Sequence, residues 1–155
     1  MRTYSTSLDN YGNIPIATDY SSEELPEQRS RQEVYNFIVQ ELTASIPNLS
    51  EATGQSMYGR INKWAGKAIL ADVYLNAEVY TGTPEWDKVI ETTDEIIQSG
   101  SYELEENYKD NFTRDNQNST ENMWSVVFDQ VNAPDNNYHM VTGKTEFNEI
   151  LRHAG

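Results

Sequence analysis

Apolar side chains recur at helical spacing in three stretches of the chain. In the first stretch, Ser30 and Glu33 have the spacing of a capping box, in which each side chain bonds the other residue's free backbone N–H. Apolar residues then follow at every fourth position, beginning with Val34, as on one face of an α-helix. Pro47 interrupts this pattern. The pattern therefore predicts a helix over residues 31–46.

Two further helices are predicted over residues 62–80 and 84–99. The helix over 62–80 is rich in alanine, whose small side chain lets a neighbouring helix approach closely. Gly82 ends this helix. The second has Pro84 at its first position, where a missing N–H costs little, and Gly100 as its C-terminal cap. The short connection predicts that the two helices form a hairpin.

The rest of the chain has weaker patterns. Residues 1–29 look mostly irregular, apart from an extended Ile14–Ile16, and Asp115–Asn122 reads as a polar loop. An acidic segment contains four spaced apolar residues that we expect to act as anchors, namely Tyr102, Leu104, Tyr108 and Phe112. Three more elements are expected: a short strand at Met123–Phe128, a turn at Ala133–Asn137 and a short helix at Thr145–Leu151.

These elements predict a mainly α-helical fold with long loops and a short strand-like segment. Leu70, Ala71 and Tyr74 resemble the Leu-Gly-x-x-Tyr core of a tetratricopeptide helix, with alanine in place of glycine. The sequence thus favours tetratricopeptide-like helix hairpins of the α-solenoid type. An ordinary helical hairpin with small residues would look similar, so on this evidence both interpretations stay open.

Charge and composition narrow the function. The 155 residues carry a formal net charge of −14, with a pI near 4.4, and include no cysteine. Such a charge disfavours nucleic acid and anionic membrane surfaces as partners. Without cysteine there is no disulfide, thiol nucleophile or thiolate metal site. The first twenty residues lack the apolar segment of a signal peptide.

Catalytic chemistry is poorly represented. His139 and His153 are the two histidines, and neither has a second histidine at metal-ligand spacing. Glu91, Asp94 and Glu95 share one helix face, whereas a glycosidase needs carboxylates facing each other across a cleft. The segment 110–121 lacks the spacing and the glycine of a calcium loop. We therefore expect no enzymatic activity, no metal and no cofactor.

One loop has the chemistry of sugar binding. After the predicted strand, Asn132, Asn137 and Tyr138 lie in a polar segment. Amides can bond sugar hydroxyls, and an aromatic ring can pack against the apolar face of a sugar. A plain turn is the alternative that composition by itself favours.

An ordered succession of motifs is more specific than any single one. The motifs are Tyr11-Gly12-Asn13-Ile14-Pro15-Ile16, Arg31-Gln32-Glu33-Val34-Tyr35-Asn36-Phe37-Ile38, Tyr58-Gly59-Arg60-Ile61-Asn62-Lys63, Ala71-Asp72-Val73-Tyr74-Leu75-Asn76-Ala77, Ser99-Gly100-Ser101-Tyr102-Glu103-Leu104, Asn107-Tyr108-Lys109-Asp110-Asn111-Phe112 and Glu121-Asn122-Met123-Trp124-Ser125-Val126. Over roughly residues 8–141, this succession resembles the central part of the SusD/RagB family of outer-membrane nutrient-binding lipoproteins of Bacteroidetes-type bacteria.

The resemblance implies a non-catalytic glycan-binding protein at the bacterial cell surface. Family members have tetratricopeptide-like helices, carry a lipid anchor on an N-terminal cysteine and act with a TonB-dependent outer-membrane transporter. They are several hundred residues long, so this chain would be a fragment, with residues 1–142 in the helical domain and 143–155 an unassigned tail. The anchor and signal peptide would lie outside it. The loop 129–139 lies near a family binding region, which adds Asp129 to the candidates.

Two other functions stay open at this stage. The chain could be a tetratricopeptide-like protein-interaction module that binds its partner through the 62–99 hairpin and has no sugar affinity. A glycosidase is the third possibility. The sequence does not specify which glycan would bind.

Overall fold

The computed structural model describes residues 1–19, 21–22, 25–113 and 116–127. The chain divides into two units, 1–125 and 126–155, and nearly all of the described residues belong to the first. The predicted turn at 133–137, the predicted helix at 145–151 and the expected boundary at 142/143 lie outside the described residues.

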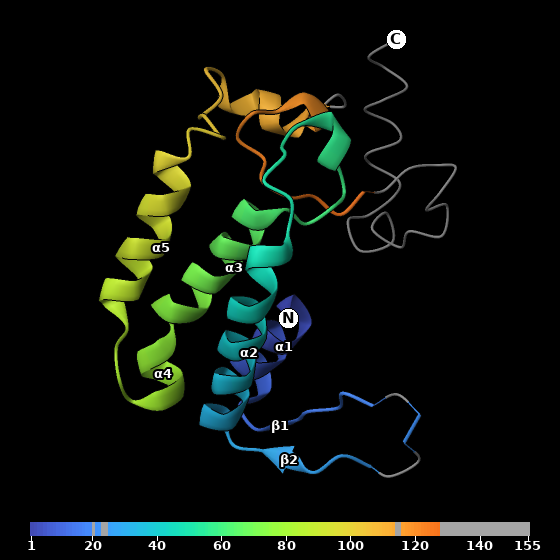
Figure 1. Ribbon diagram of the computed structural model, residues 1–155, viewed down its shortest axis with the longest axis vertical. Helices are drawn as coiled ribbons and strands as arrows, with labels where there is room; N and C mark the ends of the chain where they lie inside the picture. The colour runs from blue at the N-terminus through green and yellow to red at the C-terminus, as the bar shows by residue number, and fades with distance from the viewer. Residues whose placement is uncertain (20, 23–24, 114–115, 128–155) are drawn as a thin grey trace, which may run out of the picture. The chain divides into compact units, whose positions relative to one another are not determined.

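Helices dominate the first unit. The elements are α1 (Arg2–Tyr11), β1 (Ile14–Pro15), β2 (Gln28–Arg29), α2 (Arg31–Ser45), η1 (Ile46–Asn48), η2 (Gln55–Met57), α3 (Lys63–Leu75), α4 (Ala77–Thr81), α5 (Trp86–Gln98), η3 (Tyr108–Phe112) and η4 (Asn116–Asn118). Figure 1 shows that α2 rises, α3 and α4 descend, and α5 rises again beside them. The mainly α-helical prediction is therefore confirmed. In the part of the chain that the structure describes, no helix is long and apolar enough to cross a bilayer.

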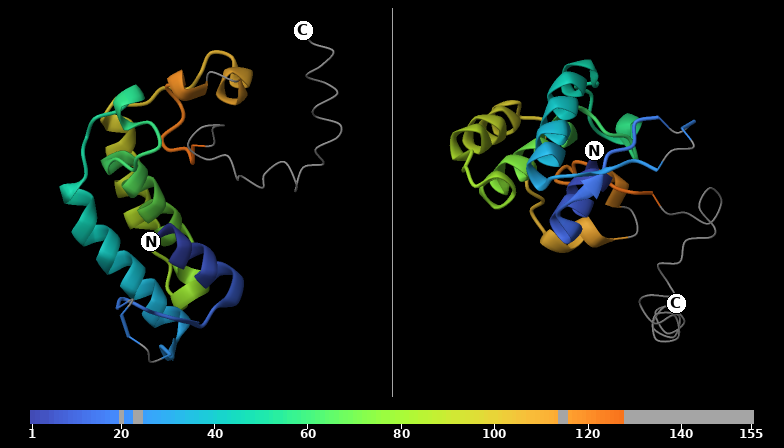
Figure 2. Two further views of the ribbon diagram at one scale, coloured as in Figure 1. Left: turned by 90° about the vertical axis from the view of Figure 1, so that its right-hand side faces the viewer. Right: turned by 90° about the horizontal axis from the view of Figure 1, so that it is seen from below.

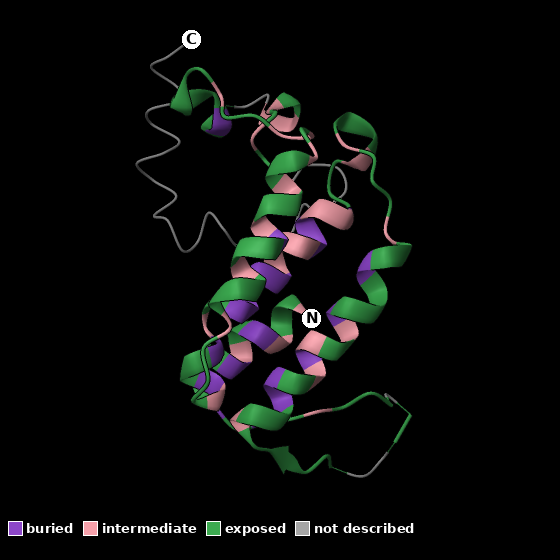
Figure 3. Cartoon of the chain, turned by 60° about the vertical axis from the view of Figure 1, so that its left-hand side comes forward, coloured by how far each residue is buried: buried purple, intermediate pink, exposed green. Residues whose placement is uncertain are grey.

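Helix α2 forms for the local reasons that the sequence predicts. The Ser30 side chain accepts the N–H of Glu33, and the Glu33 carboxylate accepts the N–H of Ser30 at 2.8 Å, which completes the capping box. The apolar stripe is buried at Val34, Ile38 and Leu42. Buried positions lie along the faces that the helices turn towards one another (Figure 3). The α-helix ends at Ser45, and a 3-10 turn containing the predicted Pro47 break follows it.

The N-terminal prediction of irregular structure is wrong, because residues 2–11 form helix α1. Ser5 and Leu8 of this helix are buried, and Met1 and Tyr4 pack against the core. These four positions have helical spacing, but serine, threonine and asparagine around them favour turns over helices. Contact with α2 compensates for this weak propensity. The right view in Figure 2 shows α1 beside α2.

The core lies between α1, α2 and the α3–α4 segment. Its buried apolar residues are Leu8, Ile14, Val34, Tyr35, Ile38, Leu42, Ile46, Leu70, Val73, Tyr74, Ala77 and Tyr80. The extended segment predicted at 14–16 contributes Ile14 from β1, which pairs antiparallel with β2. Tyr4 packs edge-on against Phe37 at a centroid distance of 5.4 Å.

The predicted hairpin exists, with two differences in its helices. The expected 62–80 helix is broken at Asn76, whose side-chain amide donates to the Asp72 carbonyl at 2.9 Å and competes with the regular backbone pattern. Gly82 ends the second piece in a left-handed conformation, as predicted. Helix α5 begins at Trp86, so Pro84 precedes it instead of occupying its first position.

Two predictions in the C-terminal half of the unit are wrong. Leu104, Tyr108 and Phe112 are strongly exposed and are not buried anchors. Tyr108 and Phe112 contact one another edge-on on η3 instead. The predicted strand at 123–128 is irregular over its described residues 123–127, where no described strand lies beside it to complete a backbone ladder.

Candidate functional site

A cleft of about 130 Å³ lies where the loop before α3 meets the segment after α5. Its lining residues are Thr53, Gly54, Met57, Tyr58, Gly59, Asn62, Ser101, Tyr102, Asn116, Gln117, Asn118, Ser119, Thr120, Asn122, Met123, Trp124 and Ser125. We call this set the amide cleft. It combines amides, hydroxyls, three aromatic rings and two methionines.

The lining residues of the amide cleft carry no charged side chain. This is unusual in a chain in which 23% of residues are charged and the net charge is −14. The cleft therefore offers neutral hydrogen-bond donors and acceptors from several amides and hydroxyls together with aromatic surface. Such a lining suits a neutral, hydroxyl-rich ligand, because a charged ligand would find no opposite charge on it.

Asn62 organises the floor of the cleft. This side chain is 1% exposed and caps α3 by accepting the Ala65 N–H at 2.9 Å. Its amide nitrogen donates to the Ala52 carbonyl at 3.0 Å and to the Tyr102 hydroxyl oxygen at 2.7 Å. One buried residue thus ties together the 50s loop, the start of α3 and the segment after α5.

The loop before α3 needs two glycines. Gly54 and Gly59 have φ values of 75° and 74°, in the left-handed region where side chains are strained. They flank the short η2 turn that places Met57 and Tyr58 in the cleft. Tyr58 is 39% exposed, so its ring remains accessible to a ligand.

Side-chain bonds hold the opposite side of the cleft. The Glu105 carboxylate accepts the N–H and the hydroxyl of Thr120, at 2.6 and 3.0 Å. These two bonds, the backbone one first, lower the pKa of Glu105 below its ordinary 4.5. Asn111 is buried, donates to the Glu121 carboxylate at 2.7 Å and accepts the Ser119 hydroxyl at 2.7 Å. The segment from 116 to 122 is therefore held by charged residues that do not line the cleft.

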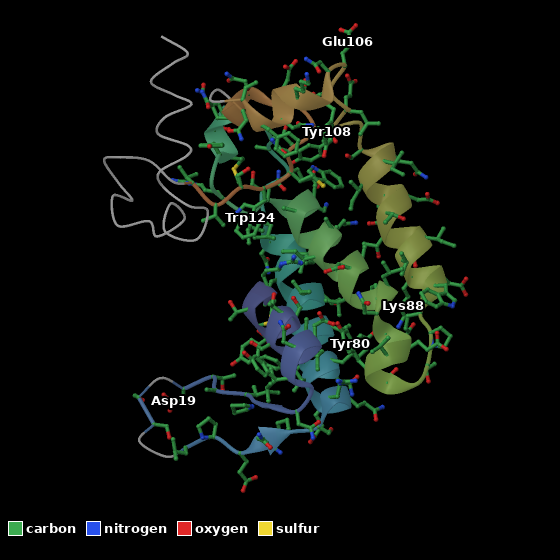
Figure 4. All side chains as sticks on the ribbon, turned by 180° about the vertical axis from the view of Figure 1, so that it is seen from behind. Asp19, Tyr80, Lys88, Glu106, Tyr108 and Trp124 are labelled. Carbon is green, nitrogen blue, oxygen red and sulfur yellow. The ribbon has the colours of Figure 1, made fainter. Side chains whose placement is uncertain are left out.

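Trp124 forms the exposed aromatic surface beside this segment. It is 37% exposed and lies next to the start of α3, below η3 and η4 (Figure 4). An indole ring in this position can pack against the C–H face of a sugar while the nearby amides bond its hydroxyls. The arrangement supports binding and includes no described acid–base pair for catalysis.

The sequence candidates for sugar binding stay untested predictions. Asp129, Asn132, Asn137 and Tyr138 lie outside the described residues, as do His139 and His153. The sequence interpretation missed the amide cleft, because it took residues 115–122 for a plain polar loop and Trp124 for part of a strand. The available signal was the run Asn116-Gln117-Asn118 shortly before a tryptophan.

Two of the carboxylates on α5, Glu91 and Glu95, line a groove together with lysines. A hollow of about 530 Å³ between α2, α3 and α5 is lined by residues that include Lys67, Glu91 and Glu95. Lys67 forms an ion pair with Glu95, and burial followed by the neighbouring Lys63 lowers the pKa of Lys67. Among the described residues, no three histidine, cysteine, aspartate or glutamate side chains gather to hold a metal ion.

Curated proteins of the SusD type resemble this chain. The starch-binding protein SusD of Bacteroides thetaiotaomicron is 32% identical over 120 residues, which cover 77% of this chain and 21% of that protein. A SusD-like protein of Bacteroides ovatus is 31% identical over 100 residues, which cover 61% of this chain and 18% of that protein. The chain thus spans about a fifth of the length of these relatives. No family model matches it.

Solved structures share the fold. A SusD-like protein of Bacteroides fragilis superposes with a TM-score of 0.68 at 21% identity, covering 82% of this chain and 25% of that one. A SusD superfamily protein of Bacteroides vulgatus superposes with a TM-score of 0.60 at 25% identity, and the match covers 70% of this chain and 24% of that one. Surface glycan-binding protein A of Bacteroides uniformis superposes with a TM-score of 0.65 at 22% identity, and the match covers 78% of this chain and 27% of that one. Over the residues that these comparisons match, the chain belongs to the SusD family.

Proposed function

We propose that this chain is part of a non-catalytic glycan-binding protein of the bacterial cell surface, and that the amide cleft contacts a neutral glycan. The observation that carries the proposal is the uncharged lining of the cleft, with Trp124 and Tyr58 exposed beside several amides. Amide groups and aromatic rings are the two kinds of surface that a sugar ring uses.

The relatives support the same class of function. One is named a starch-binding protein and another a surface glycan-binding protein. By this analogy, the whole protein acts at the outer membrane with a TonB-dependent transporter and passes its ligand to it. From their residue types, and independently of the amide cleft, we also propose the loop residues Asp129, Asn132, Asn137 and Tyr138 as glycan contacts.

Binding to a glycan panel tests the proposal. The chain is run in native gels containing starch, a β-glucan, a mannan, a xylan or a uronate-rich polysaccharide, and hits are measured by calorimetry. We expect at least one neutral polysaccharide to retard the protein, with little effect of added salt. Trp124→Ala weakens the affinity about tenfold, by loss of ring stacking and apolar contact.

Trp86→Ala is the matched control, since this tryptophan lies on α5 and does not line the cleft. It should leave affinity unchanged. The proposal is rejected if no neutral glycan binds, or if Trp124→Ala and Trp86→Ala bind equally well. Tyr138→Ala tests the loop 129–139 separately, and undiminished binding would remove Tyr138 from the proposed glycan contacts.

A protein-interaction role is the second candidate, and the exposed face of α5 favours it. Trp86, Ile90 and Ile97 are 47%, 59% and 74% exposed on this helix, while Thr92 faces the interior. If this face binds a transporter, Ile90→Glu should prevent co-purification with a TonB-dependent transporter without changing glycan binding. Unchanged co-purification would exclude this face.

A further inference from the structure

A second hollow shares part of its lining with the amide cleft. It measures about 260 Å³ and is lined by Arg2, Ala65, Ala68, Ile69, Met123 and Trp124. We call it the alanine hollow. Met123 and Trp124 line both cavities, so a ligand that packs against the indole ring in the amide cleft lies next to this hollow.

The two cavities differ sharply in chemistry. The amide cleft is lined by several side-chain amides and hydroxyls, whereas the alanine hollow is lined by apolar side chains apart from the Arg2 guanidinium and the indole N–H of Trp124. Ala65 is 3% exposed, and Ile69 packs against the apolar core. A sugar ring in the hollow would leave most of its hydroxyls without partners, which is costly. An apolar group with one hydrogen-bond acceptor is a better match.

Arg2 can supply that one bond. Its Nη1 donates to the Asp72 carboxylate at 3.1 Å, which orients the guanidinium on the rim of the hollow. Among the described residues, its other guanidinium nitrogens have no hydrogen-bond acceptor. A guanidinium donates through up to five N–H groups, so donors remain for a ligand carbonyl. The hollow thus offers methyl-lined walls and a donor at the rim.

We propose that the glycan bound in the amide cleft carries an acetyl substituent, and that this group occupies the alanine hollow. The acetyl methyl packs against Ala65, Ala68 and Ile69, and the carbonyl oxygen accepts a hydrogen bond from Arg2. The inference rests on the proposed glycan-binding function and specifies its ligand class. N-acetyl and O-acetyl groups present the same methyl and carbonyl, so both are candidates.

Matched ligand pairs test this inference. An O-acetylated xylan or mannan is compared by calorimetry with the same polymer after alkaline deacetylation, and N-acetylglucosamine oligosaccharides with glucose oligosaccharides of equal linkage. At least one acetylated member should bind about tenfold or more tightly, from the buried methyl and the additional hydrogen bond. The pair that shows the difference identifies the N- or O-linked source.

Ala68→Leu fills the hollow at a partly buried position and should abolish the preference while leaving the unsubstituted glycan bound as before. Ala44→Leu, at an exposed position on α2, is the matched control and should keep the preference for the acetylated ligand. Equal binding within both pairs, or a preference that survives Ala68→Leu, overturns the acetyl proposal and leaves the glycan proposal standing. Failure of every glycan to bind overturns both.

Discussion

The side-chain amide of Asn62 donates a 2.7 Å hydrogen bond to the hydroxyl oxygen of Tyr102, forty positions further along the chain. This bond joins the cap of α3 to the segment after α5, and both residues line the amide cleft. The shape of the cleft therefore depends on a contact between two parts of the chain that local sequence does not connect.

Removing the Tyr102 hydroxyl tests this connection. Tyr102→Phe leaves the buried Asn62 amide with one partner fewer, and we expect a loss of about 1–3 kcal/mol in the free energy of unfolding. Urea unfolding measures the loss. Tyr35→Phe is the matched control, because among the described residues the buried Tyr35 hydroxyl has no hydrogen-bond partner. It should be neutral or stabilising, and an equal loss in both variants would contradict the role of the bond.

The Tyr35 phenol offers a spectroscopic check of its burial. Burial first, and then the nearby Glu85, raises the pKa of Tyr35 to about 12. In an alkaline titration followed by phenolate absorbance, the variant Tyr35→Phe should lose part of the amplitude that titrates near pH 12. Loss of amplitude near pH 10 instead would mean that Tyr35 is accessible to water.

Helix α1 should contribute strongly to stability. Leu8 is fully buried, so Leu8→Ala leaves a cavity against α2 and should lower the free energy of unfolding by about 2–5 kcal/mol. Leu25→Ala, at a residue that is 94% exposed, should have little effect. A neutral Leu8→Ala would indicate that α1 does not pack in the core.

Gly66 should resist replacement even though it lies inside a helix. A Cβ at this position would come within 3.1 Å of both Ile46 Cγ1 and Leu49 Cδ1. Alanine gains about 1 kcal/mol in helix propensity, but crowding against the buried Ile46 costs about 1–3 kcal/mol, so Gly66→Ala should be destabilising. In a Leu49→Ala background the contact with Leu49 is relieved. Thermal unfolding should then show that Gly66→Ala lowers stability less than it does in the parent chain. A stabilising Gly66→Ala would show that η1 can move aside.

Acid should weaken the packing of the segment beside the cleft. Hydrogen bonds from Thr120 lower the pKa of Glu105 below its ordinary 4.5. The folded state therefore binds fewer protons than the unfolded state around and below pH 4.5, so this stabilisation is present above that pH and is lost as the pH falls through the folded pKa. Unfolding measured from pH 7 to pH 3 should show a shallower acid decline for Glu105→Gln.

Glu106→Gln is the control for the acid experiment. Its side chain is exposed and points outwards (Figure 4). The substitution should leave the pH profile of unfolding close to that of the parent chain. If both variants flatten the profile equally, the effect comes from net charge and not from the bonds between Glu105 and Thr120.

Features encoded within one or two helical turns could be predicted from sequence. The Ser30–Glu33 capping box, the stripe through Val34 and Ile38, and the end of the hairpin's first arm at Gly82 all depend on residues a few positions apart. Hydrogen-bond reach and the helical repeat fix such patterns locally. The succession of motifs likewise pointed to the family that the comparisons support.

Only the tertiary structure decided which distant segments meet. Helix α1 has weak propensity, and the burial of Leu8 against α2 stabilises it. Trp124 has the surroundings of a strand residue in sequence, yet it lines both the amide cleft and the alanine hollow. The packing of α3 brings Asn62 to Tyr102 and Ala68 near Trp124, and the chain spacing of these residues does not encode such contacts. The sequence thus determined α2 and the helical hairpin that follows it, whereas tertiary packing stabilised α1 and produced the candidate site.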